Sequence, residues 1–204
     1  MPKVEGIYNG SKLIGWELLC NSFNLPLQYR ERIFQAIPED FDLECFFSHL
    51  GFAKRNRLGG FIFVNLKPQT FVKYHEKILS AIDRKVVIEL REDWLSPDDL
   101  RTLYSIRKNH FFLLSIDDFG IGSSNLDRVG VLYPNFIKID MRVFRKNGRV
   151  AVRELVNFVN FLKDYTSAVL VAEKVESYLE WKASRSAGLR IWSGWYEKKL
   201  VVKK

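Results

Sequence analysis

Charged and amide side chains follow one apolar run after another in this sequence, at the point where each run ends. The residues that share this placement are Asn65, Glu89, Asp117, Asp118, Lys138 and Glu173. Carboxylate and amide oxygens are hard ligands that suit Mg²⁺ or Mn²⁺ better than zinc or copper. The adjacent Asp117 and Asp118 suggest a carboxylate that bridges two ions, as in two-metal phosphoester hydrolysis. Lys138 could orient the attacking water.

Each of these residues also has an ordinary structural explanation. An acid at a strand end is often a helix cap or a solvated loop residue, and Asp117–Asp118 before Phe119 and Gly120 could simply build a turn. Lys138 is harder to explain in this way, because a lysine between the apolar residues of FIKID needs a partner. A polar residue recurs at the end of one predicted strand after another, and this recurrence favours a shared site over unrelated structural roles.

The elements that must position these side chains alternate between short apolar runs and helix-period stretches. Strands are predicted at 4–8, 12–19, 60–66, 85–90, 111–117, 136–140, 167–173 and 189–192. Helices are predicted near 26–37, 41–56, 68–84, 96–109, 148–165 and 177–188, with one or two helical turns before residue 136. Asn9–Gly10 is a strong hairpin signal between the first two strands. Ser96 followed by Pro97 is typical of a helix start.

Strands that alternate with helices predict a mostly parallel sheet in an α/β protein. Eight such strands favour a barrel, in which the carboxyl ends of the strands face one mouth. The 204 residues are predicted to form a single domain over 1–204. A closed barrel of this type typically needs about 250 residues, so its loops must be short.

Composition restricts the partners and the location of the chain. The formal charge of +8 suits an anionic ligand. Nucleic acid is not the expected partner, because the basic clusters at 54–57 and 198–204 are not interleaved with aromatic residues. No apolar run is long enough for a membrane span, and the first ten residues lack a signal-peptide layout. Cys20 and Cys45 lie far apart and form no CxxC motif, so neither a zinc site nor a disulfide framework is expected. Together these features favour a cytoplasmic location.

Several motifs together resemble the EAL-domain family of cyclic di-GMP phosphodiesterases. The motifs are GWELL at 15–19, VNLKPQ at 64–69, VVIELRE at 86–92, LLSIDDFGIGSSNL at 113–126, FIKID at 136–140 and VAEKVES at 171–177. Their order and spacing are similar to the family pattern over about residues 12–195. The resemblance implies a modified TIM-type (β/α)8 barrel, the EAL fold, and hydrolysis of cyclic di-GMP to pGpG.

The resemblance also implies a role for individual residues. Glu17, Asn65, Glu89 and Asp117 would bind a first Mg²⁺ or Mn²⁺ ion. Asp117 would bridge to a second ion, supported by Asp118 and Glu173, and Lys138 would hold the attacking water. Glu92 would brace the loop after DDFG, and Glu176 is the second glutamate of the AExxE run, on the substrate side. EAL relatives often pair near that loop, so a homodimer is also implied.

Four positions depart from the family pattern. Asn21 stands where the family has a phosphate-contacting arginine, and Ser193 stands where it has a glutamine. The DDFG loop carries Ile121 and Ser123 where the family favours threonine and an aromatic residue. These departures favour a second hypothesis, a catalytically silent EAL domain that binds cyclic di-GMP or a regulatory protein partner. Trp192, Trp195 and Tyr196 could stack on a guanine or pack at the barrel closure.

Overall fold

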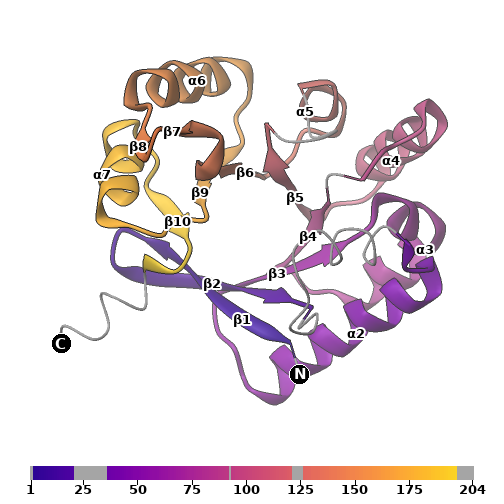
Figure 1. The fold of residues 1–204 in the computed structure, drawn as a ribbon. Helices are drawn as coiled ribbons and strands as arrows, with labels where there is room; N and C mark the ends of the chain where they lie inside the picture. Colours follow the sequence, from indigo (N-terminus) through magenta and orange to yellow (C-terminus); the bar gives the residue numbers. More distant parts are fainter. Residues whose placement is uncertain (1, 21–35, 92, 121–125, 197–204) are drawn as a thin grey trace.

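Eight strands close into a barrel in the computed structural model, which describes residues 2–20, 36–91, 93–120 and 126–196 (Figure 1). The strand order around the barrel is β1-β10-β9-β6-β5-β4-β3-β2. The strands are β1 (Lys3–Asn9), β2 (Lys12–Leu19), β3 (Phe61–Leu66), β4 (Val86–Leu90), β5 (Leu113–Phe119), β6 (Phe136–Asp140), β9 (Val169–Glu173) and β10 (Ile191–Ser193). The predicted α/β barrel is confirmed.

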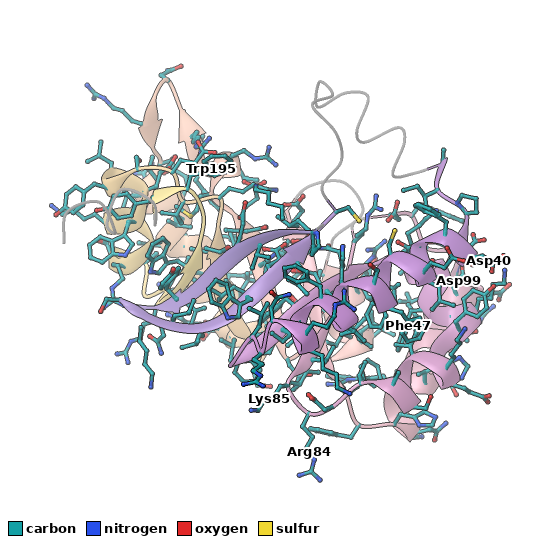
Figure 2. All side chains as sticks on the ribbon, turned by 90° about the horizontal axis from the view of Figure 1, so that it is seen from below. Asp40, Phe47, Arg84, Lys85, Asp99 and Trp195 are labelled. Atoms are coloured by element: carbon teal, nitrogen blue, oxygen red, sulfur yellow. The ribbon has the colours of Figure 1, made fainter. Side chains whose placement is uncertain are left out.

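Helices form the outer layer of the barrel (Figure 1). They are α2 (Glu39–Arg55), α3 (Pro68–Ala81), α4 (Pro97–Asn109), α5 (Leu126–Leu132), α6 (Val152–Tyr165) and α7 (Tyr178–Ser186). Figure 2 shows α2 from below, with Phe47 packed against the core cluster that α2 shares with β3 and β4. Within the described residues, no helix combines the length and apolarity needed to cross a membrane.

The β1–β2 hairpin makes this barrel irregular. β1 pairs antiparallel with both β2 and β10, whereas the other described barrel pairs are parallel. The chain reverses at Gly10, which has a φ of 62°. Glycine adopts this left-handed conformation without steric cost. Asn9 pairs with Lys12, so the predicted hairpin is confirmed, with Gly10 and Ser11 as its two turn residues.

Capping residues start the helices at the mouth of the barrel where the sequence indicates. The Ser96 side chain accepts a hydrogen bond from the backbone N–H of Asp99 at the start of α4. At the start of α7, Ser177 and Glu180 form a reciprocal capping box. Pro68 lies in the first turn of α3, where its missing N–H has no partner to lose.

Among the predicted boundaries that differ from the structure, two have a local structural cause. The helix expected at 148–165 begins only at Val152, because residues 145–150 form the short hairpin β7 (Arg145–Lys146) and β8 (Arg149–Val150) after the 3₁₀ helix η1 (Met141–Phe144). Asn147 and Gly148 have φ values of 51° and 74°, as a two-residue hairpin turn requires. β5 runs on to Phe119, with a register shift against β6 between Ile116 and Phe119. The helix expected near 26–37 falls almost wholly outside the described residues.

Candidate metal centre

An apolar layer inside the barrel supports the polar layer at its mouth. Ile7, Phe63, Val87, Phe136 and Val171 form one buried cluster contributed by five different strands. Side chains alternate between the two faces of a strand, so the residue two positions further along points into the barrel again. Those next residues are Asn65, Glu89, Lys138 and Glu173, in β3, β4, β6 and β9. The polar groups predicted at the strand ends therefore converge above an apolar plug.

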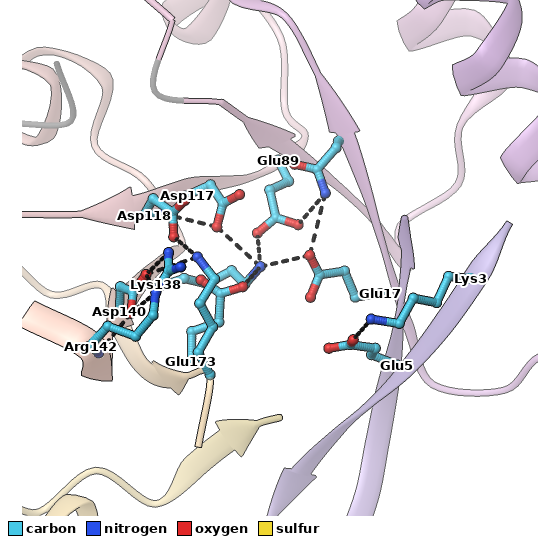
Figure 3. Close-up of polar contacts among 12 residues, drawn as sticks. Lys3, Glu5, Glu17, Glu89, Asp117, Asp118, Lys138, Asp140, Arg142 and Glu173 are labelled. Atoms are coloured by element: carbon cyan, nitrogen blue, oxygen red, sulfur yellow. Dashed lines mark hydrogen bonds and ion pairs between the residues drawn. The ribbon is translucent and has the colours of Figure 1, made fainter. Parts of the chain in front are cut away.

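Lys138 lies at the centre of this polar layer, fully buried (Figure 3). Its Nζ is 2.9 Å from Glu17, 2.7 Å from Glu89, 3.2 Å from Asp117 and 3.0 Å from Glu173, measured to the nearest carboxylate oxygen. This arrangement supplies the partners that a lysine inside FIKID was expected to need. It also brings Glu17, from the β1–β2 hairpin, to the same place as the acids of the parallel strands.

One ammonium cannot balance four buried carboxylates. Burial raises the pKa of Glu89 well above its usual value, Asp117 and Glu17 raise it further, and Lys138 only partly offsets the increase. Burial and Asp117 likewise raise the pKa of Glu173. Asp117 differs, because Lys138 and Lys174 outweigh its burial and lower its pKa. The excess negative charge is of the kind that a divalent cation would neutralise.

In the ring of carboxylates around Lys138, two oxygen atoms have neither a hydrogen-bond partner nor an ion-pair partner among the residues that the structure describes, and Glu89 Oε1 makes only its ion pair with Lys138. The two atoms without either partner are Glu17 Oε2 and Glu173 Oε2, and both are buried. Leaving a buried acceptor unpaired costs stability, so such atoms call for an explanation. Asn65 donates from Nδ2 to Glu17 at 3.4 Å and to Glu89 at 3.3 Å, and rotation of its amide would present Oδ1 instead. This all-oxygen set fits Mg²⁺ or Mn²⁺.

Asp118 is placed by an irregularity in β5. It has a φ of 45°, within the stretch where the register against β6 shifts. Ligand atoms of Asp117, Asp118 and Glu173 lie within 4.8 Å of one another, a spacing that could hold a metal ion. Burial and Asp117 raise the pKa of Asp118 to about 6, although Lys174 opposes them.

The sequence interpretation missed a second set of charged residues beside Asp118. Lys174 Nζ pairs with Asp118 and lies 2.8 Å from Asp140 Oδ2. Arg142 holds Asp140 from the other side, at 2.6 Å between Nη2 and Oδ2. Burial of Asp140 is outweighed by these hydrogen bonds from Arg142 and Lys174, which lower its pKa to about 2. The signal available in the sequence was Asp140 itself, which lies two residues after Lys138 on the same strand.

The remaining predicted residues do not all reach the ring. Ser193 is only 1% exposed, and its hydroxyl has no hydrogen-bond partner among the described residues. Glu176 is half-exposed and pairs with Arg145 Nη2 at 3.1 Å. Asn21, Glu92, Ile121 and Ser123 lie outside the described residues. Trp192 is buried and stacks on Tyr8, with centroids 5.2 Å apart, so it packs at the barrel closure.

The loop that follows β4 is held by a residue that the sequence interpretation also overlooked. Arg128, on α5, is buried and donates from Nη1 to the Arg91 carbonyl at 2.9 Å, and from Nη2 to the Asp93 carbonyl. These two acceptors flank position 92. The β4–α4 loop and α5 are therefore tied together at the mouth of the barrel.

Comparisons with known proteins agree with this geometry. The EAL domain family model matches residues 40–199, a range that begins after the hairpin carrying Glu17. No curated protein sequence matches the chain. Among solved structures, one similar fold is that of the Bacillus subtilis YkuI protein, which has an EAL domain and is in complex with cyclic di-GMP and calcium. The two structures match with a TM-score of 0.72 and 22% sequence identity, over 96% of this chain and 53% of that one.

Two further solved structures have the same fold. A standalone EAL protein from Vibrio cholerae, in a cyclic di-GMP-bound form, has a TM-score of 0.74 and 22% identity, covering 96% of this chain and 90% of that one. Klebsiella pneumoniae BlrP1, in a manganese and cyclic di-GMP complex, has a TM-score of 0.72 and 23% identity, covering 95% and 53%. This chain thus spans about half the length of two of these proteins. Because the family model matches well over half of its residues, the chain belongs to the EAL domain family.

Proposed function

We propose that this chain is a Mg²⁺- or Mn²⁺-dependent phosphodiesterase that hydrolyses one phosphodiester bond of cyclic di-GMP and releases linear pGpG. The observation that carries the proposal is the ring of carboxylates around the buried Lys138, in which three buried oxygens lack hydrogen-bond partners among the described residues. Structures of the same fold bind cyclic di-GMP with calcium or manganese, which supports the choice of substrate and cation class.

Two cation positions follow from the arrangement of the ligands. Glu17, Asn65, Glu89 and Asp117 would hold one ion, because they surround the position of the Lys138 ammonium. Asp117, Asp118 and Glu173 would hold the second, with Asp117 shared. When bound, such ions neutralise charge on the phosphodiester and lower the pKa of water. Lys138 must move aside when the first position fills.

The residues of the chain would then handle the attacking water. Once displaced by the first ion, the Lys138 ammonium would remain beside the acids and stabilise the negative charge that develops as the water loses its proton. Glu173 is suited to accept that proton, since its Oε2 is free of hydrogen bonds within the described part of the chain and burial raises its pKa. Attack of the hydroxide on phosphorus would break the bond to the ribose 3′ oxygen, which takes up a proton from solvent, so that one water is consumed and pGpG is released.

A silent receptor is the second candidate function. Asn21 lacks the charge of the arginine that the family uses to contact phosphate, and the short side chain of Ser193 is buried in the barrel wall. Both features weaken the contacts available to a substrate without touching the carboxylate ring. In this alternative the domain binds cyclic di-GMP, or a regulatory protein partner, without cleaving it.

Incubation with cyclic di-GMP separates the two functions. Pure protein with Mn²⁺ or Mg²⁺ is expected to release pGpG, detected by chromatography, and EDTA is expected to stop the reaction. A receptor would instead bind cyclic di-GMP in calorimetric titration and return it intact. If the folded protein neither bound nor cleaved cyclic di-GMP, that result would contradict both the phosphodiesterase and the cyclic di-GMP receptor.

The wider organisation of the protein is also a proposal. We take residues 1–204 as a single EAL domain that acts in the cytoplasm and pairs as a homodimer. The homodimer rests on the family resemblance, and sedimentation of the purified chain would test it. A mass of one chain at micromolar concentration would contradict it.

A further inference from the structure

Lys174 directly follows Glu173 at the end of β9 and has an unusual backbone conformation. Its φ is 56°, and Asp118, with which it pairs, has a φ of 45°. Residues with a Cβ rarely adopt this left-handed conformation, which glycine and asparagine favour. Lys174 and Asp118 therefore share an unfavourable backbone conformation and an ion pair at the mouth of the barrel. Unfavourable conformations of this kind cluster at functional sites.

Surrounding contacts hold Lys174 in this conformation. Its carbonyl accepts a hydrogen bond from Arg145 Nη2 at 3.1 Å, and the next N–H, that of Val175, donates to the Ser193 carbonyl at 3.1 Å. The side chain is 30% exposed and pairs with Asp118, on β5. The backbone conformation and the side-chain contacts together place the Lys174 ammonium against Asp118, one member of the Asp117–Asp118–Glu173 group.

The charges divide into two unequal sets. Lys138 faces Glu17, Glu89, Asp117 and Glu173, so one ammonium meets four carboxylates. On the other side, Lys174 and Arg142 meet Asp118 and Asp140, two cations against two carboxylates. A divalent ion entering the first set relieves an excess of negative charge. A second ion held by Asp117, Asp118 and Glu173 must instead compete with the Lys174 ammonium for Asp118.

We infer that Lys174 is a built-in counter-ion at the second cation position, a positioning residue that makes this EAL domain bind one divalent ion tightly and a second one weakly. The inference rests on the proposed metal-dependent function. Lys174 also has somewhere to withdraw, because Asp140 is already 2.8 Å from its ammonium. A flexible lysine stem allows that movement, which a planar, bidentate arginine would resist.

Counting bound Mn²⁺ by calorimetry and native mass spectrometry tests the inference without any turnover. The wild type is expected to bind one ion tightly and a second at least about tenfold more weakly. Lys174→Gln, which removes the charge, should strengthen the second site by about 10- to 100-fold and produce the electron paramagnetic resonance signal of a coupled Mn²⁺ pair. Lys182→Gln, an equal charge change at an exposed position of α7, should behave as the wild type does.

The outcomes separate this inference from the proposed function. Two ions of equal affinity in the wild type, unchanged in Lys174→Gln, would overturn the counter-ion while leaving the metal centre in place. No ion bound by the wild type or the variant would overturn both. Lys174→Gly guards against misfolding, because glycine accepts a φ of 56°, and it should strengthen the second site as Lys174→Gln does. A second site left weak in the folded glycine variant would also overturn the inference.

Discussion

The four carboxylates around Lys138 differ in how their ionisation affects the stability of the fold. Burial raises the pKa of Glu89 and Glu173, whereas Lys138 and Lys174 lower that of Asp117. A carboxyl whose pKa is raised by folding binds its proton more tightly in the folded chain, so it costs stability once the pH exceeds its unfolded pKa. A carboxyl whose pKa is lowered stabilises the fold above that pH. Removing the charge of Glu89 should therefore raise the free energy of unfolding, whereas removing the charge of Asp117 should lower it.

Glu89→Gln is expected to raise the melting temperature of the metal-free protein in EDTA at pH 8. A gain of about 1 kcal/mol corresponds to about 2–4 °C for a domain of this size, and it should shrink as the pH falls toward 5. Asp117→Asn should lower the melting temperature under the same conditions. Both variants should lose the stabilisation that Mn²⁺ gives the wild type. A full Mn²⁺-induced shift in either variant would contradict the ligand assignment.

Lys138→Met should destabilise the metal-free protein by about 3–5 kcal/mol, because four buried carboxylates lose their shared partner. Excess Mn²⁺ should recover part of that loss, as judged by urea unfolding with and without the ion. In the metal-loaded variant, kcat should fall strongly while KM changes little, since the ammonium acts on the developing charge. An effect confined to KM would make Lys138 a ground-state contact instead.

Strands and helices put these residues in place through ordinary local signals. Apolar runs ending in polar residues identified the barrel strands, and Ser96 identified the start of α4. The hairpin at 145–150 was missed, although Asn147–Gly148 is the same turn signal as Asn9–Gly10. The helical periodicity that follows it outweighed that signal. The longer β5 could not be predicted, because its register shift against β6 depends on tertiary pairing.

Ser177→Ala tests how far one helix start positions the site. Loss of the capping box should lower the free energy of unfolding by about 1 kcal/mol, measured in urea. The segment between Glu173 and α7 is short, so Mn²⁺ affinity should fall as well. Ser186→Ala, at the exposed end of the same helix, is the matched control and should change neither property. Equal effects of the two substitutions would contradict a positioning role for the cap.

The whole molecule combines a predictable barrel with a charge network that sequence alone did not reveal. Motif order fixed the family and the converging strands, and Glu17 was placed by resemblance alone. The pairing of Lys174 with Asp118 and Asp140 was not predictable, because it depends on left-handed backbone conformations in residues that rarely adopt them. Positions 21 and 92 remain predictions, since they lie outside the described residues.

The net charge of +8 gives a prediction for the molecule as a whole. Attraction to any polyanion by diffuse positive charge weakens steeply with salt, whereas a ligand bound at a buried metal centre is screened less. Cyclic di-GMP binding in Ca²⁺ should therefore persist at 300 mM NaCl, while any retention of duplex DNA should vanish. Fluorescence anisotropy measures both. DNA binding that survives high salt would contradict the small-ligand assignment.

The rate of pGpG formation in Mn²⁺, compared among wild type, Glu89→Gln and Glu76→Gln, tests most directly whether the acidic mouth performs the hydrolysis. Glu76 is exposed on α3, so Glu76→Gln makes the same charge change away from the barrel mouth. The wild type and Glu76→Gln are expected to release pGpG at equal rates, and folded Glu89→Gln to release none. Equal turnover by all three proteins, or none by the wild type, would contradict the proposal that this carboxylate ring is a phosphodiesterase centre.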